Sequence, residues 1–542
     1  MTLVWIESDT IQSTLSTWQA RNIVRQAQEL ARRQTYPAAI ERLDVALRLN
    51  PASVDALRLQ ARIYSQFDLP YAIPAWRALL HGESVQAEDR HEFIDLAIRL
   101  NRPDLAEPEI ARLLSSSDLT PRTLSQAVEF HLRQGHHDQA VEFGRQLHQR
   151  EPDHPDYAAQ FVRALASHPS EAVREEAFRH ADAVFRSGPE GRRAALAALA
   201  ASPRPLPPSA VSQLPHLTPP TGAAATEVIR FAELQLRAEP AARSQVLNAL
   251  IARLHPSSLE HQAALVEWLN RQGEAARVLA LHDLREIVTL PPILMAHLEA
   301  LARTREWAAL KQAAASPLPL EPWALHCFRA LAADHLRESD LSRENWRRSF
   351  DDADPAPERL LALGDLTFAL GAHDKAVEAY QHLTRDRLHR IPAYRRLAQV
   401  YAHSQDTQRL RAIMREWSAH VPDDPGPDLE FCYLSALTRK DVDVAQARAL
   451  RLFERLPERP LHRATLALLE WRRDRPQEAL RLIERSPDPL KVLDPRTRLA
   501  HAAILHSQNT APATVRQLLE GLETDALLPE EREMWQRVQR TE

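Results

Sequence analysis

Apolar and polar residues alternate at helical spacing between Thr35 and Pro51, in the stretch TYPAAIERLDVALRLNP. Ala39, Leu43 and Ala46 follow one another at intervals of four and three residues, so they lie on one face of a helix. The proline at the end of the stretch stops that helix. The preceding stretch, ARNIVRQAQELARRQ, has a similar spacing of apolar residues. The pattern therefore predicts two consecutive helices joined by a short turn.

This two-helix pattern recurs along the chain with a period of 34 residues. Four pairs of corresponding residues stand 34 positions apart: Gly364 and Ala398, Ala376 and Leu410, Tyr380 and Met414, and Leu383 and Trp417. A fixed period of this length is typical of proteins built from stacked helix pairs. The pattern is clear over about 20–190 and 356–486, and it is weak between and beyond these ranges.

The spacing of small and large residues resembles the tetratricopeptide repeat. This resemblance implies an all-α fold, an α-solenoid in which antiparallel helix pairs form a right-handed superhelix. Small residues such as Ala39 and Gly364 let the two helices of a pair approach closely, and large residues fill the seam with the next pair. Composition favours the same fold class, because helix-forming Ala, Leu, Arg, Glu and Gln dominate and strand-forming runs are scarce.

Proline content and the strength of the repeat pattern suggest where the chain divides. The segment 202–222 contains seven prolines and interrupts the pattern, so it forms either an extended spacer or a pair of short helices. We favour a boundary there, and we expect five parts: a lead-in at 1–19, an N-terminal array at 20–201, a Pro-rich linker at 202–222, degenerate helical repeats at 223–355, and a C-terminal array with capping helices at 356–542.

Charge and hydropathy limit the partners and the compartment. The net charge of -5 shows no basic surplus, so we expect no nucleic-acid partner. The longest run of small apolar residues, AALAALAA, is far shorter than a membrane span requires. The first ten residues, MTLVWIESDT, have no basic region and do not form a signal peptide as written. We expect a bacterial-type cytoplasmic protein, or a periplasmic or membrane-tethered one if an N-terminal anchor has been removed.

Motifs that carry catalytic chemistry are missing from the sequence. No glycines form a dinucleotide-binding or P-loop motif, and neither G-x-S-x-G nor H-E-x-x-H occurs. The densest histidine cluster, at His131, His136 and His137, falls on a predicted turn, where these polar side chains are solvated and diverge. We therefore expect no enzyme and no catalytic, cofactor-binding or metal-binding residue. The alternative is a divergent active site within 223–355, which continuous helix pairs there would exclude.

The resemblance implies that the first helix of each pair lines a concave groove. Carried onto the C-terminal array, it gives nine candidate partner-binding residues: Phe368, Arg395, Gln399, His403, Glu430, Leu434, Leu437, Trp471 and Arg472. Exposed aromatic and aliphatic side chains rimmed by arginine suit an extended peptide or an amphipathic helix. The equal alternative is that these side chains pack against neighbouring repeats or a capping helix.

These observations together predict a non-catalytic scaffold or adaptor that binds a peptide or helix of a partner protein. The alternative is a regulatory or sensor module in which the solenoid binds a ligand or an effector protein. RNA binding by helical repeats would require a basic inner face. The inward positions of Glu358, Asp365 and Glu430 speak against such a face.

Overall fold

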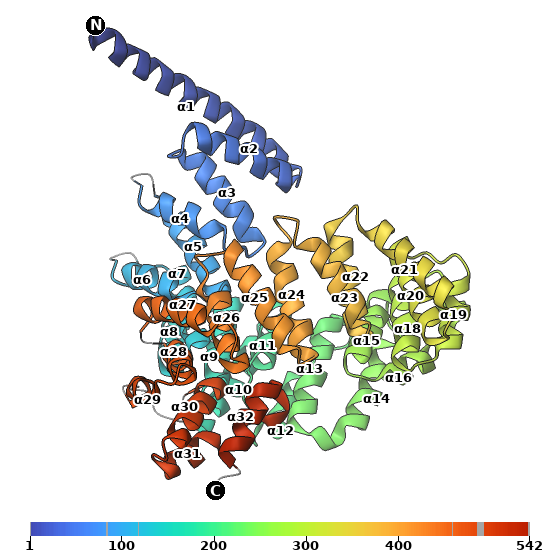
Figure 1. Ribbon diagram of the computed structural model, residues 1–542. Coiled ribbons are helices and arrows are strands. Elements are labelled where there is room, and N and C mark those ends of the chain that lie inside the picture. The colour runs from blue at the N-terminus through green and yellow to red at the C-terminus, as the bar shows by residue number, and fades with distance from the viewer. Residues whose placement is uncertain (1, 83–84, 117–118, 458, 485–492, 540–542) are drawn as a thin grey trace. The chain divides into compact units, whose positions relative to one another are not determined.

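The computed structural model describes residues 2–82, 85–116, 119–457, 459–484 and 493–539, with only the backbone described for 2–16 (Figure 1). Every regular element in these ranges is a helix, and none is a strand. Consecutive helices joined by short turns pack against each other, so they form antiparallel pairs. The expectation of an all-α fold built from helix pairs is confirmed.

The chain divides into two compact units. The first unit comprises Met1–Ala20, Ala46–Arg62 and Ala75–Pro355. The second unit comprises Arg21–Val45, Ile63–Pro74 and Ala356–Glu542.

The helices follow one another along the whole described chain. Up to residue 200 they are α1 Thr2–Arg32, α2 Tyr36–Leu49, α3 Val54–Gln66, α4 Ala72–Leu80, α5 Ala87–Arg99, α6 Pro103–Leu114, α7 Pro121–Gln134, α8 His137–Arg150, α9 Pro155–Ala166, α10 Glu171–Arg186 and α11 Pro189–Ala200. The middle of the chain forms α12 Ala210–Gln213, η1 Leu214–Leu217, α13 Ala225–Ala238, η2 Pro240–Ala242, α14 Arg243–Leu254, α15 Leu259–Arg271, α16 Ala275–Leu281, α17 Leu284–Ile287, α18 Pro291–Arg303, α19 Trp307–Ala315, α20 Pro322–His335 and α21 Ser339–Ala353. The C-terminal part forms α22 Pro357–Ala369, α23 His373–Leu383, α24 Arg390–His403, α25 Thr407–His420, α26 Pro425–Thr438, α27 Val442–Arg455, α28 Pro460–Arg472, α29 Pro476–Glu484, α30 Pro495–Ser507, α31 Pro512–Leu519, η4 Thr524–Ala526 and α32 Pro529–Gln539.

Prolines mark where many of these helices begin. A proline stands in the first turn of α6, α7, α9, α11, α18, α20, α22, α26, α28, α30 and α31. The first backbone N–H groups of a helix have no partner within the helix, so a residue without an N–H is tolerated there. A proline-rich composition is therefore compatible with a fold made of helices.

A residue with left-handed backbone dihedrals follows the first helix of most pairs. Its positive φ lets the chain turn sharply into the second helix. Successive examples are 32 to 35 residues apart within the two runs 34–135 and 273–509. From Gly273 to Arg305 and from Arg305 to Arg337 the interval is 32 residues, which accounts for the weak 34-residue register in the middle of the chain. The members are Gln34, Asp68, Asn101, Gly135, Gly273, Arg305, Arg337, Gly371, Gln405, Arg439, Asp474 and Asn509.

The pairing of a small with a large residue has a direct structural basis at Gly364 in α22. A Cβ atom added to Gly364 would lie 2.4 Å from Cε1 of Tyr380 in α23. The Tyr380 ring is fully buried, and its hydroxyl donates a hydrogen bond to Asp365 Oδ1 at 2.7 Å. The ring is thus held in the space that a side chain at position 364 would need.

The Pro-rich segment 202–222 lies inside the first unit and folds into the short helices α12 and η1. Ala210, Leu214 and Leu217 are buried in a hydrophobic cluster that extends from Val128 to Leu234. The segment follows α11 and contacts α10 and α13, so it takes the place of the second helix of a pair. Of the two conformations that its prolines allow, the structure therefore has short helices and not an extended spacer.

Two arginines bind the backbone carbonyls in and beside this segment. Arg237 of α13 donates hydrogen bonds to Ser202 O at 2.8 Å and to Arg204 O at 2.7 Å. Arg253 of α14 donates to the carbonyl oxygens of Pro219 and Pro220 at 2.6 Å each. Short helices and prolines leave carbonyl groups without helical partners, and buried carbonyls require a donor. The guanidinium groups supply those donors, which replaces the hydrogen bonding of a full second helix.

Two buried histidines in the first unit have pKa values below the usual range. His297 of α18 and His282 are both less than a tenth exposed. Burial is the main cause of the lowered pKa at each site. The charge of the neighbouring His255 lowers the pKa of His282 further, and the charge of His282 does the same to the pKa of His297. Glu286 and Asp283 act in the opposite direction without reversing the shift. Both imidazoles are thus held in the neutral form at neutral pH.

We predict that Gly364→Ala lowers the free energy of unfolding by about 1–3 kcal/mol, because the new methyl group overpacks against Tyr380. Alanine normally stabilises a helix interior by about 1 kcal/mol relative to glycine, so the predicted sign is the opposite of the intrinsic preference. Urea denaturation measures the change. In a Tyr380→Leu background, where the ring is gone, the same substitution should lose most of its cost; an equal cost in both backgrounds would contradict the packing argument.

We also predict that the free energy of unfolding falls as the pH drops below about 6.5. A histidine whose pKa is lowered on folding takes up its proton first in the unfolded chain, so protonation favours unfolding in that window. His297→Gln should reduce the slope of the free energy of unfolding against pH by up to about 1.4 kcal/mol per pH unit. Urea denaturation between pH 7.5 and 5 measures this, and an unchanged slope in the variant would exclude His297 as a source.

Candidate functional site

The nine predicted residues lie on α22, α24, α26 and α28, the first helices of four consecutive helix pairs in the second unit, and α30 begins the fifth pair. Helix α26 contacts α28, and α28 contacts α30, so these three lie in order. We call the surface over α26, α28 and α30, which includes Leu437, Trp471 and Arg472, the C-terminal groove. Each of its three helices begins with proline at its first turn, which fixes where the helix starts.

The predicted residues Phe368 and His403 lie together at the end of α22 and α24. Their ring centroids are 5.6 Å apart, and His373 of α23 lies 5.3 Å from Phe368 and 5.1 Å from His403. His403 is exposed, as is the predicted Gln399 on the same helix. The three rings form an aromatic cluster at the turn end of the two repeats, and the repeat pattern did not single out His373.

The ion pair between α22 and α24 is made by Arg396 and not by its predicted neighbour Arg395, which is half-buried. Arg396 Nε lies 2.7 Å from Asp365 Oδ1, the same oxygen that accepts the Tyr380 hydroxyl. Asp365 thus connects both helices of its own pair to the next pair. Burial raises the pKa of Tyr380, and its hydrogen bond to Asp365 adds to that shift.

A buried polar cluster joins α26 and α30 to the last helix, α32. Glu531 Oε1 of α32 accepts a hydrogen bond from the Tyr433 hydroxyl at 2.8 Å and lies 3.3 Å from Arg496 Nε. Arg496 also binds Glu430 Oε2 at 2.6 Å, and its guanidinium lies 5.0 Å from the centre of the Tyr433 ring. Glu531 Oε2 accepts the backbone N–H of Leu528 at 2.8 Å. We call Glu430, Tyr433, Arg496 and Glu531 the carboxylate anchor.

The charges of the carboxylate anchor stabilise one another. Burial would lower the pKa of Arg496, but the carboxylates of Glu430 and Glu531 outweigh it and hold that pKa above its usual value. Burial raises the pKa of Tyr433, and Glu531 adds to the shift. A buried carboxylate is costly unless it is paired and hydrogen-bonded. Glu531, which is 2% exposed, meets both conditions here.

The exposure expected for Leu434 is wrong, because its side chain is fully buried. Every residue from Phe431 to Leu437 is buried, since α26 lies among α25, α27, α28 and α32. A helix that is enclosed by neighbours is apolar around most of its circumference. Leu437 is also buried, at 4% exposure, but it borders the cavity described next.

A cavity of about 680 Å³ lies between the C-terminal groove and α32. Its lining includes Leu437, Trp471 and Arg472 of the predicted site, together with Arg439, Met534 and Arg537. Trp471 is half-buried and packs beside a small hydrophobic cluster around Ala467 and Ala479. The structure therefore brings three of the nine predicted residues to one hollow.

Arg472 is the cation closest to the aromatic wall of this cavity. Its guanidinium lies 4.4 Å from the centre of the Trp471 ring, and its Nε donates to Ala436 O at 2.9 Å. Burial lowers the pKa of Arg472 to about 10, and the nearby cations Arg439 and Arg537 contribute, while Glu533 opposes them. Positive charge thus accumulates at the cavity, so an added carboxylate there would be stabilised.

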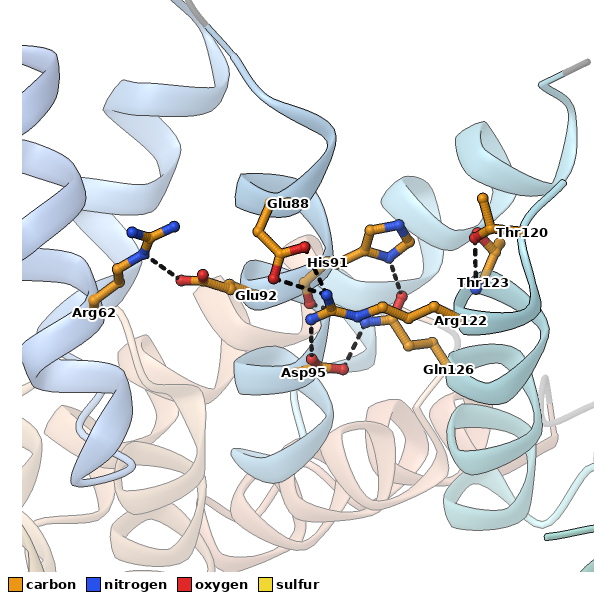
Figure 2. A network of polar contacts seen from close by, with 9 residues as sticks. All are labelled: Arg62, Glu88, His91, Glu92, Asp95, Thr120, Arg122, Thr123 and Gln126. Atoms are coloured by element: carbon orange, nitrogen blue, oxygen red, sulfur yellow. Dashed lines mark hydrogen bonds and ion pairs between the residues drawn. The ribbon is translucent and has the colours of Figure 1, made fainter. Parts of the chain in front are cut away.

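The first unit has a contrasting arrangement on its first helices α3, α5 and α7, where charged side chains pair across neighbouring repeats (Figure 2). Arg122 of α7 binds Glu88 at 2.7 Å and Asp95 at 3.0 Å, both on α5. Gln126 donates to the His91 carbonyl at 2.9 Å. The hydrogen bond from Arg122 is the main cause that lowers the pKa of Glu88. We call this network the polar ladder.

The polar ladder extends to both sides. Arg58 of α3 binds both oxygens of the fully buried Asp89 at 2.8 Å, and Arg163 of α9 binds Glu129 of α7 at 2.6 Å. The partners are 27 to 35 residues apart, and most are about one repeat length apart. These pairs were not predicted from the sequence. A signal for them exists, because opposite charges stand about one repeat length apart on the first helices. The paired charges of the polar ladder hold the first helices of neighbouring repeats together.

No group of three or more His, Cys, Asp or Glu residues in the described ranges is arranged to hold a metal ion. No helix of the same ranges is long and apolar enough to cross a membrane.

Comparison with known proteins gives helical-repeat structures as neighbours but no sequence family. No family model and no curated sequence matches the chain. Among solved structures it is similar to yeast Tom70, with 13% identity over 84% of this chain and 95% of that chain and a TM-score of 0.31. It is also similar to Naa15/Naa10 bound to HypK-THB, with 12% identity over 96% and 94% and a TM-score of 0.32. The chain itself has the all-α fold of stacked helix pairs described above.

A third similar structure corrects the expectation about nucleic acid. The pentatricopeptide repeat protein PPR10 in complex with an 18-nt psaJ RNA element shares 12% identity over 98% of this chain and 94% of that chain, with a TM-score of 0.33. Helical-repeat proteins of this kind thus include one that binds RNA. The exclusion of nucleic acid from overall charge is wrong, because net charge averages over a long chain and does not describe one face of it.

We predict that Asp89→Asn lowers the free energy of unfolding by about 3 kcal/mol, because Arg58 then loses the carboxylate that neutralises it in a buried site. Glu88→Gln is the matched control. Its side chain is half exposed, so its loss should cost less than about 1 kcal/mol. Urea denaturation compares the two variants, and equal costs would show that burial of the Arg58–Asp89 pair does not matter.

Proposed function

We propose that this chain is a non-catalytic scaffold or adaptor that binds a peptide or helix of a partner protein in the C-terminal groove. The observation that carries the proposal is the cavity of about 680 Å³ bordered by Leu437, Trp471 and Arg472. Between α22 and α23 of the same unit, by contrast, the large side chain of Tyr380 fills the space between the helices. At the cavity, an aromatic wall and cations face a space that the repeats themselves leave open.

The residue types around the cavity favour protein recognition. Tryptophan and arginine contribute more binding energy in protein interfaces than most residue types, above all where they are partly desolvated. Trp471 and Arg472 are stacked and half-buried, so they are already fixed in position before a partner arrives. Arg439 adds a second cation at the exposed turn after α26. A partner segment that places an apolar side chain against Trp471 and a carboxylate near Arg439 would gain from both.

The size of the cavity favours a short segment as the partner element. About 680 Å³ accommodates a few side chains but not a folded domain. A helix or an extended peptide presents a few side chains along one edge, which matches this volume. The aromatic cluster of Phe368 and His403 and the half-buried Arg395 would extend contact along α22 and α24.

The middle of the chain supports a role without catalysis. Residues 223–355 form the helices α13 to α21 with short connections, in the same helix-pair arrangement as the remainder of the first unit. The sequence has none of the glycine-rich or nucleophile motifs that bring reactive groups together. We therefore assign the chain a binding role, in which its surface recognises a partner protein.

The proposal is tested with the double variant Trp471→Ala/Arg439→Glu, which removes the aromatic wall and reverses one cation. Proteins recovered with the tagged full-length chain from its native cells are purified, and their Kd values are measured by titration calorimetry. A partner that uses the groove should bind the double variant at least about 10-fold more weakly than the wild type.

Arg481→Glu is the matched control, because Arg481 is exposed on the second helix α29 and lies outside the cavity lining. It should leave the Kd unchanged. If every recovered partner binds the double variant as tightly as the wild type, the groove is not the binding site. Circular dichroism and thermal melting establish that both variants are folded before the comparison is made.

A further inference from the structure

Helix α32 does not continue the stack of helix pairs. The pairs of the second unit end with α30 and α31, and a further first helix would contact that last pair. Helix α32 does contact α30, but it also contacts α26, which is two repeats earlier in the array. Thr407 at the start of α25 also donates a hydrogen bond to Glu530 of α32 at 2.5 Å. The helix therefore lies across the C-terminal groove.

The contact of α32 with the groove has the character of peptide recognition. Glu531 enters the carboxylate anchor, where it meets the Tyr433 hydroxyl and Arg496. Met534 and Val538, three and seven residues further on, are buried at 5% and 2% exposure. Residues at these intervals share one face of a helix. Helix α32 thus presents one carboxylate and two apolar side chains to the groove, which is the usual pattern of a helix bound in a groove.

Helix α32 does not fill the C-terminal groove over α28. The helix touches the groove at both sides, yet the cavity of about 680 Å³ remains between it and Trp471. Surfaces that border an open cavity forgo the dispersion contacts of close packing. A helix with larger side chains at this point would fill the space and gain those contacts. Helix α32 is therefore an occupant that a better-fitting helix can replace.

The local stability of α32 depends on the groove. It has 11 residues, and isolated helices of this length are marginal in water. Residues 520–528, with the short turn η4, connect it to α31. A helix that is tethered by such a segment competes for its site at an effective concentration in the millimolar range.

We propose that α32 is an exchangeable occupant of the C-terminal groove, and that the partner is an amphipathic helix that presents a carboxylate to Arg496 and Tyr433. This inference rests on the proposed function and names both its partner class and its regulation. The partner carries apolar residues three and seven positions after the carboxylate, as α32 does, with a bulkier side chain over Trp471. Binding releases α32 from the groove.

Charge complementarity explains why the partner is acidic at this point. Three of the charged residues around the cavity, Glu530, Glu533 and Arg537, belong to α32 itself and leave with it. Of the charged residues in the cavity lining, Arg439 and Arg472 then remain, and Arg496 of the carboxylate anchor keeps Glu430 as its partner. This local excess of positive charge attracts a carboxylate and disfavours a second basic segment.

A peptide added in trans tests the exchange without knowledge of the partner. A fluorescent peptide of residues 525–542 is titrated with the full-length chain, and anisotropy reports its binding. In the variant Met534→Asp/Val538→Asp, the chain's own α32 carries charges on its buried face and leaves the groove. We expect this variant to bind the peptide at least about 10-fold more tightly than the wild type, because intramolecular competition is removed.

Two altered peptides test the chemistry of recognition. A peptide with Glu531→Lys should bind the variant at least about 10-fold more weakly, since the anchor then faces a like charge. A peptide with Asp525→Lys, which makes the same change of charge at an exposed position outside the cavity lining, should bind as the natural peptide does. If wild type and variant bind the natural peptide equally, or if neither binds it, the exchange does not occur and the inference is wrong.

Hydrogen exchange gives a second measurement. It uses the wild-type chain alone, so it does not depend on whether a variant folds. Amides of α32 should exchange at least about 10-fold faster than those of α26 and α30, because α32 opens on its own. Equal protection would make α32 a permanent part of the fold and overturn the inference. The proposed function would survive that result if Trp471→Ala/Arg439→Glu still weakened a partner, so the two proposals fail separately.

Discussion

The close approach of two helices within each repeat is the constraint on which the remainder of the structure depends. At Gly364 the ring of Tyr380 occupies the space of the absent side chain, and its hydroxyl reaches Asp365 on the same first helix. Asp365 in turn binds Arg396 of the next repeat. One small residue thus sets the distance within a pair and, through its neighbour, the connection to the following pair. Because no pair buries its own apolar face, these local contacts build the array.

Stacking leaves the first-helix face free for other uses, and the two units use it differently. In the first unit the polar ladder pairs charges on neighbouring first helices, as Arg122 of α7 does with Glu88 and Asp95 of α5 (Figure 2). Such pairs stabilise the stack and leave little for a ligand. In the second unit the same face carries a cavity, a stacked Trp471 and Arg472, and a helix from the chain's own end. This difference is why we place recognition there.

The fold was largely predictable from the sequence, and the site only in part. Ala39, Gly364 and Tyr380 occupy positions at which small or large residues recur from repeat to repeat, so the pattern alone identified their packing roles. Leu434 shows the limit of that approach, because its position in the repeat predicted exposure while α28 and α32 enclose it. The Tyr433–Glu531 contact spans 98 residues and follows no repeat period, so no sequence signal at repeat spacing could have revealed it.

The sequence by itself determined the local rules of this protein: helices that begin at prolines, turns about 34 residues apart, and small residues where helices meet. These features depend on neighbours within one or two repeats, so they are written in the spacing of nearby residues. Only the tertiary structure decided that 202–222 replaces a second helix, that charges pair across the first unit, and that α32 returns to the C-terminal groove. Such contacts join side chains on separate elements, and their energy depends on burial and distance that spacing along the chain does not specify.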